Sequence, residues 1–278
     1  METTLFFRCF CECMIWHVIC VFLLCRQFDG KEQIMKLLFI RPIITERADA
    51  LEEEILKEFA GPDVQVVARH LEHGPESIEN EYDLVYSAPF VLQEAIKGEK
   101  DGFDGIISYC FANPAVDACR EAVRIPVLGS GEASMALAAA IGRRIGIVTI
   151  LQNILPMIRK QCSEYLMTGK LVSVRDADIP VTSIGDGSDL IFEKLYQESL
   201  KCIVEDGADV IVLGCTGFAG FAKRIQNRLE EEGYIVPVID PAAASLKMIE
   251  TLVTCGVKNS SVTYMKPIDK KIRFPERK

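Results

Sequence analysis

Short apolar runs alternate with longer amphipathic stretches along the chain from Met35 onwards. In the first amphipathic stretch, apolar residues recur at helical spacing, at Leu51, Ile55, Leu56 and Phe59. The runs rich in Val, Ile and Leu predict strands over residues 37–41, 64–68, 105–109, 127–128, 145–149, 172–174, 209–213 and 236–239. The amphipathic stretches predict helices over residues 46–60, 90–99, 115–123, 134–141, 154–167, 189–205, 218–232 and 242–255. Strands that alternate with helices form parallel sheets covered on both faces, so the pattern predicts an α/β fold.

The two halves of this pattern resemble each other. Residues 103–134 contain FDGIISYCFANP and IPVLGSGEAS, and residues 208–245 contain ADVIVLGCTGFA and VPVIDPAAAS. In each segment an apolar strand ends in a cysteine, a turn and a helix follow, and a Pro-Val strand leads to a second helix. The repeat predicts two similar lobes, each a parallel sheet flanked by helices, with the active site in the cleft between them. The expected boundaries are 35–131 plus 240–265 for lobe 1, 132–239 for lobe 2, 266–278 for a tail and 1–34 for an N-terminal extension outside the fold.

The first 34 residues differ in character from the rest of the chain. Their apolar run over residues 14–25 is shorter than the roughly 20 apolar residues that cross a bilayer. The stretch MKLLFI from Met35 reads as a start of translation that runs directly into the first strand. We therefore expect a cytoplasmic protein without membrane association. The alternative is that the extension is translated and serves as a signal or a membrane anchor.

Composition narrows the function classes. The chain has 278 residues and a formal net charge of −9, which argues against the basic face that a nucleic-acid-binding protein needs. It contains eleven cysteines, but the part after residue 34 has no C-x-x-C pair and no His/Cys cluster at zinc spacing. Scattered cysteines in a chain of this length fit a reducing cytosol. We expect a small-molecule partner, no nucleic acid and no metal.

Cys110 and Cys215 are the candidate reactive residues, because each follows a predicted strand. In open parallel sheets, ligands bind beyond the carboxyl ends of the strands. A helix follows each cysteine in the pattern, and a helix N-terminus lowers the pKa of a nearby thiol. The cysteines inside helical patterns are expected to be small buried apolar side chains. These are Cys119, Cys162, Cys202 and Cys255.

Two opposed thiols suit the inversion of a stereocentre. One thiolate removes a proton from carbon, and the other thiol delivers a proton to the opposite face. The enolate that develops needs hydrogen-bond donors, which the backbone N–H groups of Phe111, Ala112, Thr216 and Gly217 can supply. The chain lacks the G-x-G-x-x-G, G-x-x-x-x-G-K-[ST] and G-x-S-x-G motifs, so nothing in it indicates a nucleotide site or a serine nucleophile. His70 and His73 read as surface residues.

With these segments assembled, the chain resembles the aspartate/glutamate racemase superfamily, and within it the hydantoin racemase branch. The resemblance covers residues 35–264 and rests on two cysteine motifs together with four shorter segments. The motifs are CFANP and VLGCTGFAG, and the shorter segments are IPVLG, GEAS, YDLVYSAP and IGIVTI. The resemblance implies that Cys110 and Cys215 are the two catalytic cysteines. Two features depart from the branch. In IRPIIT, Arg41 and Ile43 stand where the branch usually has the asparagines of N-P-N-T, and Asn113 stands where aspartate is common.

We therefore predict a cofactor-independent racemase or epimerase that acts on a hydantoin, on allantoin or on an amino acid, and that forms a homo-oligomer. Ser87, Thr149 and Thr216, with the turn amides, are expected to hold carbonyl or carboxylate groups. Arg41 and Asn113 are expected to contact the substrate as well, and an arginine pointing into the cleft would favour an acidic one. The alternatives are a maleate isomerase-like or malonate decarboxylase-like enzyme of the same superfamily, and a non-catalytic protein that binds a small molecule.

Overall fold

The computed structural model describes residues 34–45, 49–165, 167–185 and 188–271. The chain divides into two units, Met1–Ile34 and Met35–Lys278, and the strands and helices described below all belong to the second unit. The predictions made for residues 1–33 lie outside the described residues. Among the helices of the described part, none is both long enough and apolar enough to cross a membrane.

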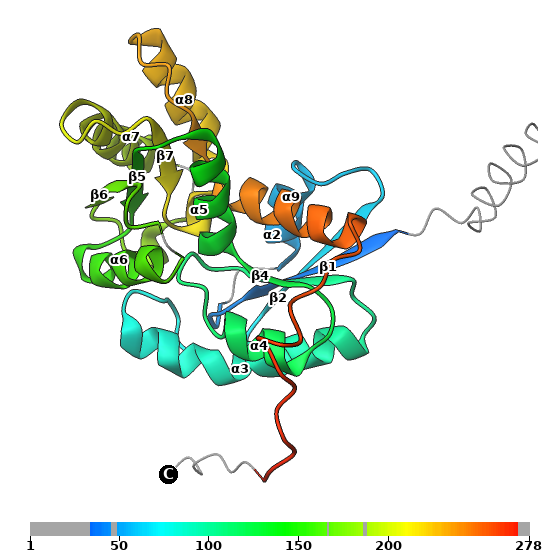
Figure 1. The fold of residues 1–278 in the computed structure, drawn as a ribbon. Coiled ribbons are helices and arrows are strands. Elements are labelled where there is room, and N and C mark those ends of the chain that lie inside the picture. Colours follow the sequence, from blue (N-terminus) through cyan, green and yellow to red (C-terminus); the bar gives the residue numbers. More distant parts are fainter. Residues whose placement is uncertain (1–33, 46–48, 166, 186–187, 272–278) are drawn as a thin grey trace, which may run out of the picture. The chain divides into compact units, whose positions relative to one another are not determined.

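Two parallel four-stranded sheets with the same strand order form the framework (Figure 1). The first sheet has the order β2-β1-β3-β4, with β1 (Met35–Arg41), β2 (Val64–His70), β3 (Gly105–Ser108) and β4 (Val127–Gly129). The second has the order β6-β5-β7-β8, with β5 (Ile145–Thr149), β6 (Leu171–Asp176), β7 (Val210–Leu213) and β8 (Val238–Ile239). The predicted α/β fold with two similar parallel sheets is confirmed, while the exact lobe boundaries stay a prediction.

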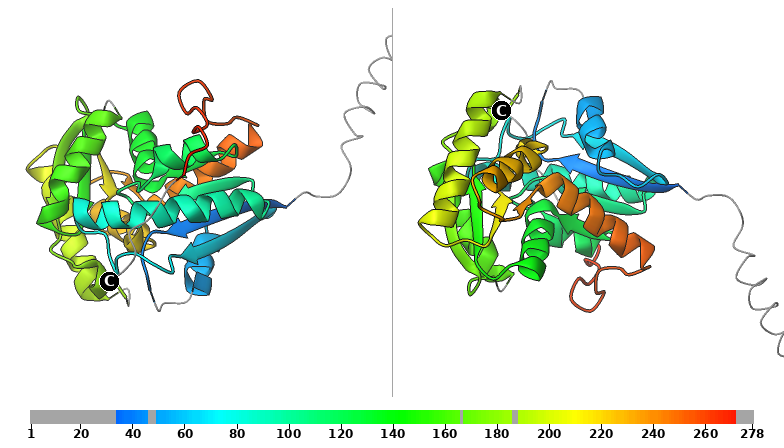
Figure 2. Two further views of the ribbon diagram at one scale, coloured as in Figure 1. Left: turned by 90° about the horizontal axis from the view of Figure 1, so that it is seen from below. Right: turned by 90° about the horizontal axis from the view of Figure 1, so that it is seen from above.

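Helices surround both sheets. They are α2 (Asp49–Lys57), α3 (Glu81–Lys100), α4 (Val116–Ala122), α5 (Ser130–Ile141), α6 (Leu155–Glu164), α7 (Asp189–Val204), α8 (Phe221–Glu231) and α9 (Pro241–Thr254). Short 3-10 turns lie between some of these elements, η1 (Gln152–Ile154), η2 (Val181–Ser183) and η3 (Thr216–Phe218). Figures 1 and 2 show α9, drawn in orange, lying beside the first sheet although it follows the last strand of the second.

The alternation of side chains along β1 explains how the first sheet is covered. Leu37 and Phe39 pack into one cluster with side chains of α2 and α9, and Leu38 and Ile40 pack into another with side chains of α3 and α4. All four are fully buried, and each such side chain contributes roughly 1.5–3 kcal/mol by leaving water. In the second sheet, apolar side chains of β5 and β7 form one cluster with those of α5, α6, α7 and α8. Both sheets are therefore apolar inside, and polar chemistry is left to the strand ends.

One predicted helix differs clearly from the structure. The helix expected over residues 90–99 begins at Glu81, where the Asn80 side chain accepts a hydrogen bond from the Asp83 N–H at 3.0 Å. Pro89 lies inside the helix, and its missing N–H leaves the carbonyl of Val85 without a helical partner. The Val85 side chain is 66% exposed, so water reaches this part of the helix. Solvation explains why the helix continues through the proline.

Asp240 joins the segment before α8 to the start of α9. Its carboxylate accepts hydrogen bonds from the Ala242 and Ala243 N–H groups at the start of α9, at 2.9 and 3.4 Å. It also accepts one from the Gly220 N–H, at 2.7 Å, just before α8. Asp240 is only 9% exposed, so water cannot replace it on these donors. The residue fixes the segment between Cys215 and α8 to the N-terminus of α9.

We predict that Asp240→Ala lowers the free energy of unfolding by about 3 kcal/mol, because it leaves three N–H groups without an acceptor. Ser188→Ala is the matched control: Ser188 caps α7 through a single bond of 3.4 Å to the Ile191 N–H, and its loss should cost about 1 kcal/mol. Urea unfolding followed by circular dichroism measures both values. Equal losses in the two variants would contradict the joining role of Asp240.

Candidate active site

A cavity of about 710 Å³ lies at the carboxyl ends of the central strands. In the first sheet the chain runs from β1 outwards to β2 on one side and to β3 and β4 on the other, and the second sheet repeats this around β5. The connections on the two sides leave the sheet in opposite directions, and a crevice forms between them at the carboxyl ends of the strands. The lining comes from 41–45, 70–72, 109–110, 181–182, 184–185 and 215–217, with Glu52 and Glu76. Both halves of the chain therefore contribute to one cavity.

Cys110 is placed by the end of β3. The Tyr109 N–H donates to the Ile40 carbonyl at 2.8 Å, which keeps the chain in the sheet up to the residue before the cysteine. The chain then turns, and the Cys110 N–H donates a hydrogen bond to the Ser108 carbonyl at 2.9 Å. The Ser108 hydroxyl donates to the Pro114 carbonyl at 2.8 Å and closes the far side of the turn. We call residues 110–115 the Cys110 turn.

Cys215 is placed in the same way by the end of β7. The Gly214 N–H donates to the Val148 carbonyl at 2.7 Å, and the Thr149 hydroxyl donates to the Gly214 carbonyl at 3.1 Å. A Cβ atom on Gly214 would lie 2.9 Å from the Thr149 Cβ, closer than real Cβ contacts. Only glycine lets the chain pass this closely over β5 before it reaches Cys215.

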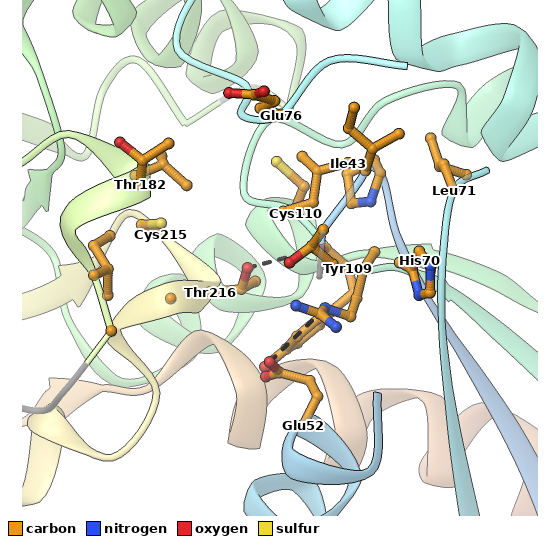
Figure 3. Close-up of a pocket in the computed structure, with 18 of the residues that line it drawn as sticks. Ile43, Glu52, His70, Leu71, Glu76, Tyr109, Cys110, Thr182, Cys215 and Thr216 are labelled. Carbon is orange, nitrogen blue, oxygen red and sulfur yellow. Dashed lines mark hydrogen bonds and ion pairs between the residues drawn. The ribbon is translucent and has the colours of Figure 1, made fainter. Parts of the chain in front are cut away.

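The two cysteine segments meet at the cavity floor. The Thr216 hydroxyl lies 3.5 Å from the Tyr109 carbonyl, at the limit of a hydrogen bond (Figure 3). Both thiols are half-buried and line the same cavity. Each also faces a backbone amide of its own turn, Ala112 for Cys110 and Gly217 for Cys215, which favours its thiolate.

The expected lowering of the thiol pKa values is wrong. Burial raises the pKa of Cys110 to about 11, against the weaker opposite effect of the Ala112 N–H. Burial also raises the pKa of Cys215 to about 12, and the negative charges of Cys110, Glu52 and Glu79 raise it further. Helix dipoles do not compensate, because α4 begins only at Val116 and α8 only at Phe221. Both cysteines are therefore mainly thiols at neutral pH.

Arg41 lines the cavity, but its guanidinium is held by carboxylates of the protein. Its Nη1 lies 2.8 Å from Asp49 Oδ1, and its Nε lies 3.9 Å from Glu52 Oε2. The side chain of Arg41 is only 8% exposed. Asp49 also contacts the Nδ1 atom of His70, at 2.8 Å. Arg41 is thus part of an ion-pair cluster with excess negative charge, which works against the acidic substrate that an arginine at this position suggested.

Four other residues expected at the site lie outside the lining of this cavity. Ser87 is fully buried in α3 and its hydroxyl donates to the Leu84 carbonyl at 2.9 Å. Thr149 is fully buried below Gly214. Phe111 and Ala112 are buried in the Cys110 turn. Direct substrate contact by these side chains finds no support in the geometry.

Asn113 faces away from the cavity and caps a helix. Its Oδ1 accepts a hydrogen bond from the Gly131 N–H at 2.8 Å, in the first turn of α5. Its Nδ2 donates to the Tyr165 hydroxyl at 3.1 Å. The close fit is clear at Gly129, where a Cβ atom would lie 2.3 Å from Asn113 Oδ1. The contacts of Asn113 are those of a residue that fixes the Cys110 turn.

Several lining residues had no signal in the sequence. Glu52 sits on an amphipathic helix, where a glutamate normally faces water, yet it is 6% exposed. Tyr109 is 3% exposed, and the negative charge of Glu52 adds to burial in raising its pKa. Its position next to Cys110 was the one available hint. Thr182 and Ile184 also line the cavity, although no motif in the sequence pointed to either residue.

The described residues offer no group of three or more His, Cys, Asp or Glu side chains arranged to hold a metal ion. The lining of this cavity supplies reactive side chains and backbone amides. Its lining includes the thiols of Cys110 and Cys215 and the carboxylates of Glu52, Glu72 and Glu76. One backbone amide of each turn faces the thiol of that turn.

Comparison with known proteins gives consistent matches over most of the chain. Residues 46–249 match the sequence profile of the family described as Asp/Glu/Hydantoin racemase. A hydantoin racemase from a Pseudomonas species is 34% identical over 244 residues, covering 88% of this chain and 93% of that protein. The structure of an allantoin racemase from Klebsiella pneumoniae matches with a TM-score of 0.81 and 31% identity, covering 86% of this chain and 96% of that one. An allantoin racemase from Pseudomonas fluorescens matches with a TM-score of 0.80 and 26% identity, covering 86% and 100%.

The raised thiol pKa values predict a specific alkylation profile. The rate constants of iodoacetamide with Cys110 and Cys215 should rise about tenfold per pH unit from about pH 7 to 9.5, because only the thiolate reacts. Peptide mass spectrometry after timed alkylation measures each site. Cys255 checks in the same digest that the reagent is active: the expectation that it is buried is wrong, because it caps the exposed C-terminal end of α9. A plateau at either cavity cysteine within this pH range would contradict the assignment.

Proposed function

The chain belongs to the Asp/Glu/hydantoin racemase family and is an isomerase of the racemase type, and we propose that it interconverts the enantiomers of a hydantoin or a related cyclic ureide with Cys110 and Cys215 as paired acid and base. One observation carries the proposal: two thiols at equivalent strand ends of the two sheets line a single cavity. The similarity to hydantoin and allantoin racemases supports the substrate class.

The proposed reaction moves one proton out and one proton in. The thiolate of one cysteine removes the proton from the stereocentre, and the electron pair left on carbon is delocalised into the adjacent carbonyl. The thiol of the other cysteine then delivers a proton to the opposite face. Afterwards the two cysteines have exchanged protonation states, so the same pair is ready for the reverse direction. The N–H groups of the two turns are the candidate donors to the enolate oxygen.

The electrostatic interaction between the two thiols suits this order of proton transfers. A negative charge on Cys110 raises the pKa of Cys215, so ionisation of one thiol disfavours ionisation of the other. The pair therefore passes through a state with one thiolate and one thiol, which is the state that the exchange requires. A thiolate with a raised pKa is scarce at neutral pH but is a stronger base towards a carbon acid.

The charges of the cavity favour an uncharged substrate over a dicarboxylate. Three carboxylates, Glu52, Glu72 and Glu76, stand in the lining against the guanidinium of Arg41, which is already paired. Within the described part of the chain, neither Glu72 nor Glu76 forms an ion pair. In the view of Figure 3, Glu76 and Glu52 lie on opposite sides of Cys110. An anionic substrate would be repelled from both directions, whereas a neutral ureide would not.

We predict that single Cys110→Ser and Cys215→Ser variants lose roughly 100- to 10,000-fold in racemisation rate, because a serine hydroxyl is a far weaker acid than a thiol. Each variant should still exchange the substrate proton for deuterium in heavy water, starting from one enantiomer only. Polarimetry and proton NMR with each enantiomer of allantoin and of a 5-alkylhydantoin measure the two effects.

The matched control for these variants is Cys255→Ser, which makes the same change at an exposed position, and buffer without protein gives the spontaneous rate. Unimpaired racemisation in Cys110→Ser or Cys215→Ser would overturn the paired mechanism. Absence of deuterium exchange by the unmodified protein across the panel would favour a non-catalytic binding protein. Slow alkylation of the cavity cysteines does not separate these two functions, because their raised pKa values alone produce it.

A second prediction concerns substrate charge. We expect kcat/KM for aspartate and glutamate to lie at least about 100-fold below that for the best cyclic ureide, which corresponds to about 2.7 kcal/mol. The Glu72→Gln/Glu76→Gln double variant should narrow this gap by reducing the negative charge of the cavity. Coupled assays or chiral chromatography measure both ratios. Equal rates with dicarboxylates and ureides would contradict the charge argument.

A further inference from the structure

A second cavity, of about 150 Å³, borders the Cys110 turn. Ala112 and Asn113 of the turn line it, together with residues of α3, α4 and α6. It shares no lining residue with the larger cavity, which Cys110 itself lines. The turn that carries the thiol is thus bordered by a separate cavity.

A buried acceptor without a partner belongs to this cavity. Gln161 of α6 is 6% exposed, and its Nε2 donates to the Ala112 carbonyl. This bond fixes the orientation of the amide, because a flipped side chain would bring Oε1 against that carbonyl. The Oε1 atom is buried and has no hydrogen-bond partner among the described residues. An unpaired buried acceptor is destabilising because it has lost its hydration, and a donor in the cavity would satisfy it.

The charges at the mouth of the cavity select the kind of donor. The lining contains three carboxylates, on Glu81, Asp117 and Glu164, and one ammonium group, on Lys160. Lys160 lies 3.4 Å from Glu81, and Asp117 lies 3.2 Å from Arg120. Within the described residues, Glu164 forms no ion pair. The excess negative charge favours a cation, and the small volume and partly apolar wall favour a short organic one.

We propose that the second cavity binds a small organic cation with N–H donors, an alkylguanidinium or alkylammonium ion, and that this ligand stabilises the Cys110 turn. One N–H donates to Gln161 Oε1, and the positive charge lies towards Glu164. A donor at Oε1 polarises the amide and strengthens the bond from its Nε2 to the Ala112 carbonyl. The ligand thereby acts on the turn without entering the active-site cavity.

The Cys110 turn is the kind of segment on which such a contact has an effect. Asn113 and Ala115 both have left-handed backbone conformations, with φ of 52° and 57°, which are strained for residues other than glycine. Side chains from the second half of the chain hold the turn, through Gln161 to Ala112 and through Tyr165 to Asn113. Strengthening one of these few bonds increases the population of the strained backbone conformation relative to more relaxed conformations of the turn.

Binding is tested by isothermal titration calorimetry with methylguanidinium chloride. We expect saturable binding at one site, and at least tenfold weaker binding of tetramethylammonium chloride, a cation of similar size without N–H donors. Gln161→Met, which removes the acceptor, and Glu164→Gln, which removes the charge, should each weaken binding at least threefold. Glu231→Gln, an exposed change on α8, is the matched control and should leave it unchanged.

Equal affinity for the two cations, or affinity unchanged in both Gln161→Met and Glu164→Gln, would overturn the proposal. Circular dichroism and thermal melting check that Gln161→Met folds, and Glu164→Gln still tests the site if it does not. For the effect on the turn, iodoacetamide labelling is repeated with saturating methylguanidinium. The rate at Cys110 should change at least threefold while that at Cys215 stays the same. An unchanged rate at Cys110 would refute the link to the turn. None of these measurements depends on racemase activity.

Discussion

The central strands of both sheets are buried on both faces, and this constraint decides where the protein can carry out chemistry. Leu37–Ile40 of β1 and Val210–Leu213 of β7 are fully buried. Polar and reactive groups are left to the strand ends, where the chain leaves the sheet and backbone N–H groups become available. Because the strand order reverses at β1 and at β5, the strand ends separate at these points and leave room for a ligand.

The same burial governs the thiols. Turns tight enough to present Cys110 and Cys215 at one cavity also exclude water from them, and the loss of hydration raises both pKa values. The gain in base strength comes with a low population of thiolate, and the negative charge of one thiolate disfavours ionisation of the other thiol. The acidic groups near Cys215, Glu52 and Glu79, act in the same direction. The burial of Cys110 and Cys215 at the strand ends therefore decides both where the thiols lie and how readily they ionise.

The Cys110 turn depends on contacts from both halves of the chain. Its backbone is strained at Asn113 and Ala115, and side chains outside the turn hold it in place. Asn113 connects the turn to α5 and to Tyr165, and Gln161 connects it to α6. The Cys110 thiol therefore stands on a strained turn that borders two cavities. The corresponding Cys215 segment is anchored differently, through Gly214, Thr149 and the Gly220 bond to Asp240.

Local periodicity in the sequence was sufficient to predict the α/β fold, the two similar sheets and the position of both cysteines after central strands. These features follow from apolar runs and strand–turn–helix order, which each segment carries by itself. The tertiary structure alone decided which groups share the cavity. Glu52 enters it because α2 packs against β2 and contributes Leu56 to the apolar cluster of the first sheet. Ser87 and Asn113 lie outside it because their hydrogen bonds hold them elsewhere. The sign of the thiol pKa shift was decided in the same way, since burial depends on contacts between segments far apart in the chain.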